Sequence, residues 1–215
     1  MKILFVRHAQ CYGNVDGKYD TGYKTRLTPL GYKQADALAE QLMKFNFDVI
    51  LTSPAERAMH TVLPYLKLTS RKAEVWPEFV EMRGRKDIDT PLPPEIRYNG
   101  PVEIPADLRE FFTLRADREG MLMPPLDESY EEGQRRATLA AQRLLQLYGN
   151  TETSVLLVAH ACNGARVIEA LMRIPLDGRF QHVNTGATLL QQKANGDFIT
   201  LFVNRILIDP ALLES

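Results

Sequence analysis

Short apolar runs alternate along this chain with longer stretches in which apolar residues recur every three or four positions. The first pattern predicts buried strands and the second predicts helices. In residues 28–45 the apolar positions follow the helical period, Thr28 suits the N-cap and Pro29 suits the first helical position. Strands are expected at residues 2–6, 48–51, 73–76, 154–158, 188–192 and 198–204, and further helices at 128–148, at 164–172 and from a Ser53 cap with Pro54 in the first turn. This alternation predicts an α/β fold, a three-layer α/β/α sandwich around a mostly parallel sheet, in a single domain over residues 1–215.

Residues 83–125 differ from the rest in being rich in proline and charge, with only short apolar clusters. The one regular element that the pattern favours there is a modest helix at residues 106–114. A stretch of this length is too long for an ordinary connecting loop. We therefore expect an insertion that folds over the main body as a lid and helps to set specificity.

Composition restricts the classes of partner. With 26 Lys and Arg against 27 Asp and Glu, the formal net charge is −1, so the basic excess typical of nucleic-acid or membrane-surface binding is missing. Two cysteines do not form a disulfide framework, and neither a signal-peptide apolar run nor a membrane-length apolar run is seen. We expect a reduced, cytoplasmic protein that binds no nucleic acid and no membrane; the sequence leaves its oligomeric state open.

Polar residues follow several of the predicted strands. Arg7-His8 ends the first, Ser53 and Arg57 follow the second, and His160 ends the very apolar strand at 154–158. In open α/β sheets, ligands bind at the carboxyl edge of the strands. Each signal alone has a structural explanation, such as a capped strand end or a solvated helix arginine. Together, with Glu81 beyond the third strand, they predict a pocket with cations, two imidazoles and one carboxyl group.

Such a set suits phosphoryl chemistry. Arginine forks neutralise phosphate oxygens through paired N–H donors. A nucleophilic histidine must be neutral, and neighbouring cations disfavour its protonated form. A carboxylic acid could then protonate the departing alkoxide.

The motifs that hold these residues resemble those of the histidine phosphatase superfamily, which is phosphoglycerate-mutase-like. The opening Arg7-His8-Ala9-Gln10 with Asn14 is similar to the family's R-H-G-E-T-x-x-N. Six further matches follow in the family's order: Thr21-Gly22 with its substrate loop, residues 27–35 with L-T-x-x-G-x-x-Q-A, residues 53–61 with S-x-x-x-R-A-x-x-T, residues 77–81 with P-x-L-x-E, residues 158–166 with V-x-H-G-x-x-x-R, and Asn184 before the last strands.

The resemblance implies a residue-by-residue assignment. His8 would be the nucleophile, Arg7, Arg57 and His160 would bind the phosphoryl group, and Glu81 would be the proton donor. Asn14 would also contact the phosphate, and Thr21, Gly22 and Ala161 would lie at the substrate. The resemblance further implies a reaction without metal or other cofactor on a small phosphate ester, which agrees with histidines that lack zinc-site spacing.

Departures from the family pattern keep alternatives open. Ala9, Gln10, Cys11 and Ala161 replace family residues by small or near-isosteric ones. The spacing from Glu81 to Gly84 is one residue shorter than usual, so Glu78 is the alternative acid. The segment after the acid, which begins Met82-Arg83-Gly84, does not resemble that of the mutases.

We therefore favour a phosphatase over a phosphotransferase of the mutase type, with Arg83 facing a second anionic group of the substrate or else lying in a solvated loop. A catalytically weak phosphate-binding module is the third hypothesis. It is disfavoured because both histidines and both arginines are present.

Overall fold

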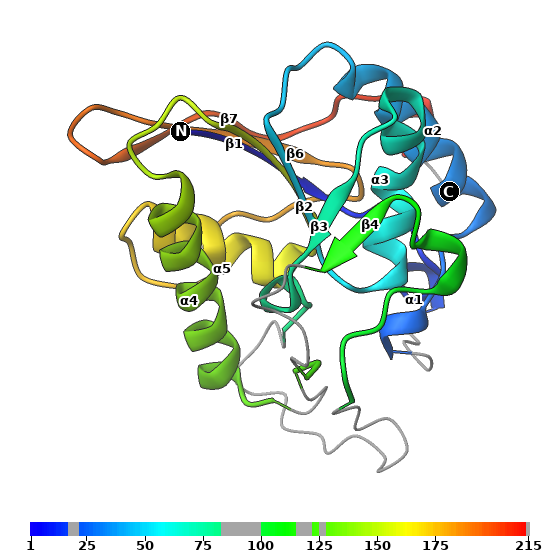
Figure 1. The fold of residues 1–215 in the computed structure, drawn as a ribbon, viewed down its shortest axis with the longest axis horizontal. Coiled ribbons are helices and arrows are strands. Elements are labelled where there is room, and N and C mark those ends of the chain that lie inside the picture. The colour runs from blue at the N-terminus through cyan, green and yellow to red at the C-terminus, as the bar shows by residue number, and fades with distance from the viewer. Residues whose placement is uncertain (17–21, 83–99, 115–121, 125–127, 214–215) are drawn as a thin grey trace.

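A twisted seven-stranded sheet runs through the centre of the part of the chain that the structure describes (Figure 1). The structure is a computed structural model that describes residues 1–16, 22–82, 100–114, 122–124 and 128–213. Its strands are β1 (Lys2–Arg7), β2 (Val49–Thr52), β3 (Ala73–Val75), β4 (Phe112–Leu114), β5 (Ser154–Ala159), β6 (Ala187–Gln192) and β7 (Phe198–Arg205). Its helices are α1 (Tyr12–Asp16), α2 (Pro29–Leu42), α3 (Glu56–Thr69), α4 (Tyr130–Tyr148) and α5 (Ala161–Leu171), with short 3₁₀ turns η1 (Gly22–Lys24), η2 (Pro77–Phe79), η4 (Ala106–Leu108) and η6 (Pro210–Leu212).

The sheet is mostly parallel. Its strand order is β4-β3-β2-β5-β1-β6-β7, and the first five strands of this order pair in parallel. Only β6 and β7 are antiparallel, as a hairpin on one side. The α/β class and the mostly parallel sheet predicted from the sequence are thus confirmed.

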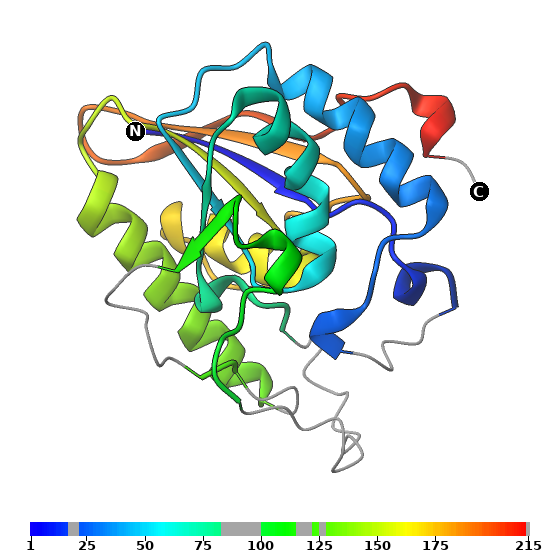
Figure 2. The ribbon, with the colours of Figure 1, turned by 45° about the vertical axis from the view of Figure 1, so that its right-hand side comes forward.

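Helices cover both faces of the sheet, which makes three layers (Figure 2). The alternation along β1 shows the two faces directly: Leu4 and Val6 join the core with α2 and α3, whereas Ile3 and Phe5 join the core with α4 and α5. All four side chains are almost fully buried. A strand buried on both faces reads as a continuous apolar run, which is why residues 2–6 carry no polar residue after Lys2.

The starts of the helices differ in how well the sequence predicts them. Thr28 caps α2, its hydroxyl accepting from the Gly31 N–H at 3.0 Å, as predicted. Helix α3 begins at Glu56, after Ala55, and not at Pro54, because the Ser53 hydroxyl accepts from the Ala55 N–H in a turn ahead of the helix. Helix α5 begins at Ala161, directly after its strand and three residues before the predicted start.

The predicted helix at residues 106–114 is wrong. The structure has the 3₁₀ turn η4 there, followed by strand β4, which pairs in parallel with β3 (Ala73 with Phe112). Leu108 and Phe112 are buried four residues apart, a spacing that is also compatible with one face of a helix. Hydrogen bonding along the otherwise free edge of β3 outweighs that weak local preference.

Part of the expected insertion lies against the main body. Val102 and Met123 pack with Tyr23 and Val80, and the Met123 N–H donates to the Gly100 carbonyl at 2.8 Å. Val80 directly precedes Glu81, so the described part of the insertion contacts the segment that carries this residue. Much of the predicted lid, Arg83 included, lies outside the described residues, and its role as a lid stays a prediction.

Within the described ranges, no helix combines the length and the apolar character needed to cross a membrane.

Substituting Gly164 tests the packing of α5 on β1. A Cβ at this position would lie 2.1 Å from Cζ of Phe5. Alanine is favoured over glycine in a helix by about 1 kcal/mol, whereas overpacking a core costs roughly 1–3 kcal/mol. We expect Gly164→Ala to lower the free energy of unfolding, measured by urea denaturation. Combining it with Phe5→Leu, which removes the clashing ring, should cost less than the sum of the two single changes; a more stable Gly164→Ala protein would show that the contact is not tight.

Candidate active site

Parallel pairing gathers the predicted site residues at one edge of the sheet. Strands β2, β5 and β1 are neighbours, with Thr52 opposite Val158 and Arg7 opposite Ala159. Just beyond these pairs the His8 N–H donates to the Ala159 carbonyl at 2.9 Å, and the Ser53 N–H donates to the Val158 carbonyl at 3.1 Å. The side chains of His8, Ser53 and His160 therefore leave adjacent strands at the same height.

The two imidazoles form the centre of this edge. His8 and His160 have ring centroids 5.2 Å apart with the planes inclined by 62°, and both side chains are buried. Nδ1 of His8 lies 2.7 Å from the Ala9 carbonyl. Because a carbonyl only accepts, Nδ1 carries the hydrogen, and in the neutral ring Nε2 keeps the free electron pair.

His160 is held from the other side. Its Nε2 lies 2.8 Å from the Ser53 hydroxyl, and among the described residues its buried Nδ1 has no hydrogen-bond partner. A buried polar atom without a partner costs free energy unless a ligand satisfies it. The His160 Nδ1 is therefore suited to contact a bound anion.

Burial and two arginines keep both imidazoles neutral. Burial, followed by the positive charges of Arg57 and Arg7, holds the pKa of His8 well below its usual value, against the opposing effect of the Ala9 carbonyl. Burial and then Arg57, His8 and Arg7 lower the pKa of His160 in the same way. The site thus has unprotonated imidazole nitrogen beside fixed positive charge, which is what attack on an anionic phosphate requires.

The arginines come from different elements. Arg57 lies in the first turn of α3 and is 4% exposed. Arg7 ends β1, donates through its terminal NH1 to the His182 carbonyl at 2.7 Å, and within the described residues leaves its buried Nε without a partner. The buried guanidinium of Arg57 and the half-buried guanidinium of Arg7 give the pocket a strong local positive field although the whole chain is nearly neutral.

The loop after His8 is braced by residues whose roles the sequence analysis did not recognise. The Ala9 N–H donates to the Thr61 hydroxyl at 2.9 Å, which itself donates to the Arg57 carbonyl at 2.6 Å. Gln34 of α2 accepts from the Gln10 N–H at 2.8 Å. Thr61 and Gln34 both stand in the matched motifs, so those motifs held the signal.

Asn14 lies in this brace. Its side-chain oxygen accepts from the Cys11 N–H at 3.1 Å and from the Asn184 amide at 3.1 Å, and Asn184 also donates to the His8 carbonyl at 2.9 Å. Asn14 and Asn184 thus connect the His8 loop to the segment before β6. The predicted phosphate contact of Asn14 stays a prediction.

The Glu81 carboxylate lies at the amino end of α5. Its Oε1 accepts from the Asn163 N–H at 2.8 Å and the Met82 N–H at 3.0 Å, and its Oε2 accepts from the Cys162 N–H at 3.2 Å. Both helix N–H groups lie within three residues of His160, so the carboxylate contacts the main chain that directly follows one of the two imidazoles. For the alternative acid, Glu78, the main-chain carbonyl accepts from the side-chain amide of Asn163 at 3.2 Å.

Of the remaining predicted substrate residues, some lie within the described part of the chain and others do not. Gly22 begins η1, and Ala161 is the first residue of α5. Ala161 also lines a pocket of about 210 Å³, together with Arg7, Cys162 and Arg166. Thr21 and Arg83 fall outside the described residues.

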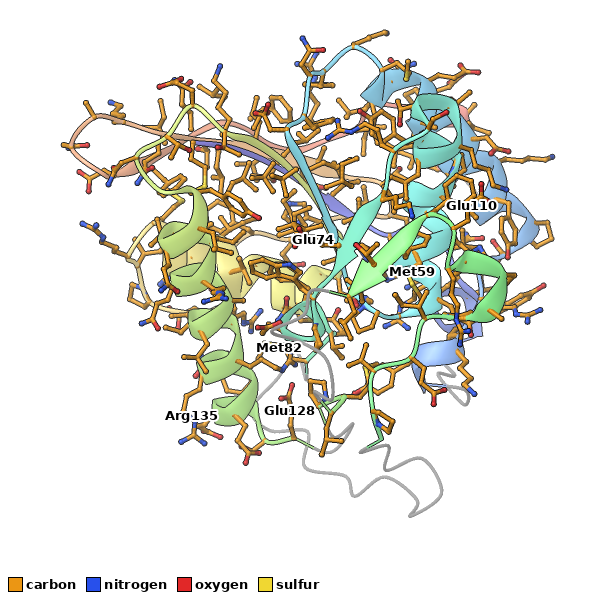
Figure 3. All side chains as sticks on the ribbon, in the orientation of Figure 1. Met59, Glu74, Met82, Glu110, Glu128 and Arg135 are labelled. Atoms are coloured by element: carbon orange, nitrogen blue, oxygen red, sulfur yellow. The ribbon has the colours of Figure 1, made fainter. Side chains whose placement is uncertain are left out.

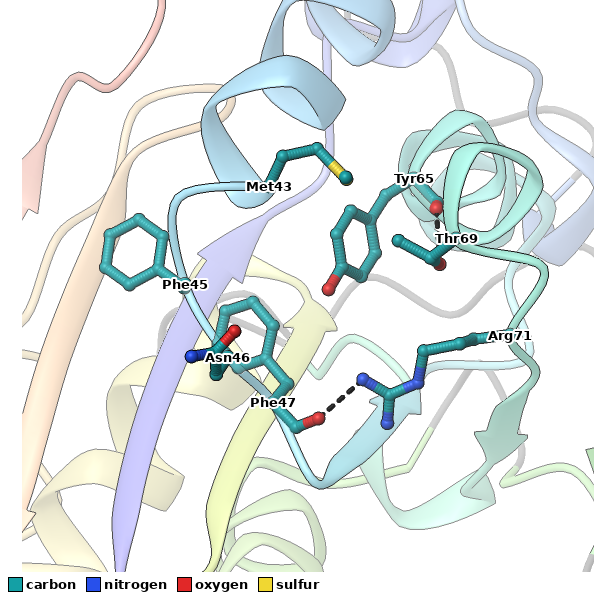
Figure 4. A pocket seen from close by; sticks show the side chains of 7 residues that line it. All are labelled: Met43, Phe45, Asn46, Phe47, Tyr65, Thr69 and Arg71. Atoms are coloured by element: carbon teal, nitrogen blue, oxygen red, sulfur yellow. Dashed lines mark hydrogen bonds between the residues drawn. The ribbon is translucent and has the colours of Figure 1, made fainter.

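A second pocket is not part of this site. It is about 220 Å³ in volume and lies between the ends of α2 and α3, where the Arg71 guanidinium donates to the Phe47 carbonyl (Figure 4). Phe47 and Arg71 precede β2 and β3, so this pocket is at the amino edge of the parallel strands, opposite the histidines. In the described part of the chain, no cluster of three or more His, Cys, Asp or Glu residues could hold a metal ion.

Comparisons with known proteins point to one family. Residues 3–205 match the family model described as the histidine phosphatase superfamily (branch 1). Adenosylcobalamin/alpha-ribazole phosphatase of Escherichia coli (strain K12) is 35% identical over 82 residues, 38% of this chain and 40% of that protein. Putative phosphoserine phosphatase 2 of Hydrogenobacter thermophilus is 40% identical over 62 residues, 29% of this chain and 30% of that protein. The matched stretches thus span well under two thirds of these relatives.

Solved structures show the same fold over nearly the whole chain. A putative alpha-ribazole-5'-P phosphatase from Escherichia coli superposes with a TM-score of 0.69 at 20% identity, covering 95% of this chain and 97% of that one. A phosphoserine phosphatase from Entamoeba histolytica, solved with phosphoserine, gives a TM-score of 0.65 at 23% identity, covering 94% and 96%. Since the family model covers almost the entire sequence and the solved structures share its fold, this chain belongs to the histidine phosphatase superfamily, branch 1.

Proposed function

We propose that this protein is a phosphatase that hydrolyses a small phosphate monoester through a phosphohistidine on His8. The observation that carries the proposal is the state of His8: a buried, neutral imidazole whose Nδ1–H is held by the Ala9 carbonyl, which leaves Nε2 as the nucleophile beside two arginines. The relatives are named as phosphatases, which supports hydrolysis over transfer between two organic substrates.

In the first step the His8 Nε2 attacks phosphorus and the bond to the ester oxygen breaks. Glu81, as the carboxylic acid, gives its proton to the departing oxygen, and Arg7, Arg57 and His160 stabilise the charge on the phosphoryl oxygens. Among the described residues, Glu81 Oε2 accepts one N–H, that of Cys162, so this oxygen has an electron pair available to carry the proton.

In the second step a water molecule attacks the phosphorus of phosphohistidine. The Glu81 carboxylate takes the water proton, the N–P bond breaks, and its electron pair returns to His8 Nε2. Inorganic phosphate leaves, and both residues regain their starting states. Apart from the attacking water and the substrate, each group that acts in these two steps belongs to the chain.

Replacing His8 tests the nucleophile. We expect the wild-type protein to release phosphate from para-nitrophenyl phosphate in the presence of EDTA, and His8→Ala to abolish this turnover because it removes the nitrogen that forms the N–P bond. Alkaline quench during turnover and mass spectrometry should find phosphate on the peptide that contains His8.

His60→Gln is the matched control, since the His60 ring contacts the Tyr32 ring edge-to-face between α2 and α3 and stands outside the proposed site. Activity that persists in His8→Ala would contradict the phosphohistidine route. Turnover that EDTA abolishes would show that a metal ion takes part.

Replacing Arg57 tests the electrostatics of the site. Arg57 is the second cause, after burial, of the low pKa of His8. In Arg57→Gln the protonated imidazole loses a repelling charge, so the pKa of His8 should rise, while burial still keeps it below the usual value. NMR titration of ¹⁵N-histidine-labelled protein measures this.

Arg173→Gln is the control, because Arg173 is exposed beyond the carboxyl end of α5 and should leave the titration of His8 unchanged. A downward shift of the His8 pKa in Arg57→Gln would contradict the assigned role.

A further inference from the structure

The guanidinium of Arg136 in α4 uses all five of its N–H donors. Nε donates to Glu128 Oε2 at 3.0 Å, and the NH2 group donates to Glu128 Oε1 and, at 3.3 Å, to the Glu81 carbonyl. The NH1 group donates to the Val80 carbonyl at 2.7 Å and to the Glu78 carbonyl at 2.8 Å. Three of the five bonds therefore go to the main chain of residues 78–81, the segment that ends at Glu81.

The ion pair within this cluster is buried. The side chains of Arg136 and Glu128 are 12% and 8% exposed. A buried pair of this kind contributes little net stability compared with apolar residues, although removal of one partner alone is costly. Stability is thus a weak explanation for the pair, whereas the geometry that it imposes on its neighbours is specific.

The surroundings leave the cluster little freedom. Gly133 stands one turn before Arg136, and a Cβ there would lie 2.9 Å from the Met82 Cβ and 3.3 Å from Glu128 Oε1. Figure 3 shows Met82 and Glu128 at the foot of α4, below α5, with Arg135 turned outward from the same helix. Helix α4 therefore packs tightly against the main chain on both sides of Glu81.

Helix α5 holds the other end of the same residue. The Glu81 carboxylate accepts the N–H groups of Cys162 and Asn163, and the Asn163 amide donates to the Glu78 carbonyl. The main chain of Glu81 is thus fixed by α4 and its side chain by α5. If the main chain moved, the carboxylate would lose its alignment with the helix end and with the histidines.

We propose that Arg136, oriented by Glu128, is a positioning residue for the proton donor: it fixes the main chain at residues 78–81 so that the Glu81 carboxyl group can reach the leaving-group oxygen. This inference rests on the proposed function, in which Glu81 is that donor. Glu128 lies directly after residues 125–127 and Met82 directly before residue 83, so the pair also ties together the two ends of the predicted insertion.

A comparison of leaving groups separates positioning from general structural support. The para-nitrophenolate anion leaves without a proton, whereas the alkoxide of an alkyl phosphate needs one. Glu81→Gln should therefore lower kcat/KM for an alkyl phosphate by about 10²–10⁴-fold and affect para-nitrophenyl phosphate far less.

Arg136→Lys keeps the positive charge but has only three donors, and it lacks the planar fork that spans Glu128 and the carbonyls. We expect it to lower kcat/KM for the alkyl phosphate by on the order of 10–100-fold, because small misplacements of a catalytic group have effects of this size. The kcat/KM for para-nitrophenyl phosphate should fall far less, so that Arg136→Lys shows the same dependence on the leaving group as Glu81→Gln.

Two further proteins guard against loss of folding. Arg136→Met combined with Glu128→Leu replaces the pair by apolar side chains and leaves no buried charge unpaired, so it should lose less free energy of unfolding than Arg136→Met alone, while the carbonyls of residues 78–81 lose their donor. This double variant should show the same selective loss of kcat/KM for the alkyl phosphate. Arg135 is exposed and adjacent to Arg136 in α4. Arg135→Met is therefore the matched control and should leave kcat/KM unchanged for both substrates.

The outcomes are distinct. If Glu81→Gln lowers kcat/KM equally for the alkyl phosphate and for para-nitrophenyl phosphate, Glu81 is not the proton donor. Both the proposed acid and this inference then fail. The other outcome is that Glu81→Gln lowers kcat/KM for the alkyl phosphate alone, while Arg136→Lys and the double variant lower kcat/KM equally for both substrates or change only the free energy of unfolding. In that case the proposed function stands and the positioning role is overturned.

Discussion

The parallel pairing of β1 with β5 is the constraint on which the site depends. It places Arg7 opposite Ala159 and continues one residue further, where the His8 N–H donates to the Ala159 carbonyl. A shift of register by one residue would turn every side chain of β1 to the opposite face. The core prevents such a shift, because Leu4 and Val6 are buried on one face and Ile3 and Phe5 on the other. Packing of the sheet therefore fixes the distance between the two imidazoles.

The same burial that fixes the histidines also sets their chemistry. Removal from water disfavours the protonated form of both rings, and Arg57 and Arg7 add to this effect. Burying the guanidinium of Arg57 and partly burying that of Arg7 is itself unfavourable. An anionic ligand offsets this positive charge, so the electrostatics of the site favour the phosphate ester that we propose as its substrate. The hydrogen bond from His8 Nδ1 to the Ala9 carbonyl then decides that Nε2 is the nitrogen with the free electron pair.

Helices α4 and α5 act on the site through the main chain. The amino end of α5 directs two N–H groups at the Glu81 carboxylate, and α4 holds the carbonyls of residues 78–81 through Arg136. These contacts join segments that are 55 to 82 residues apart in the sequence. The described part of the insertion adds Val102 and Met123 against Val80, so the segment carrying Glu81 is in contact with three separate parts of the chain.

Periodicity and motif order by themselves determined the fold class, six of the seven described strands and the residues that surround the imidazoles. They could do so because buried parallel strands are continuous apolar runs and because a polar residue after such a run marks the binding edge. The sequence did not predict strand β4, because residues 112–114 are extended only through their pairing with the edge of β3. The role of Ser53 also changed: local sequence suggests a helix cap, yet its hydroxyl contacts His160. Arg136 carries no local signal, because an arginine on an amphipathic helix is usually solvated. Its five acceptors come from Glu128 and from carbonyls more than 50 residues away, and only the tertiary structure brings such groups together.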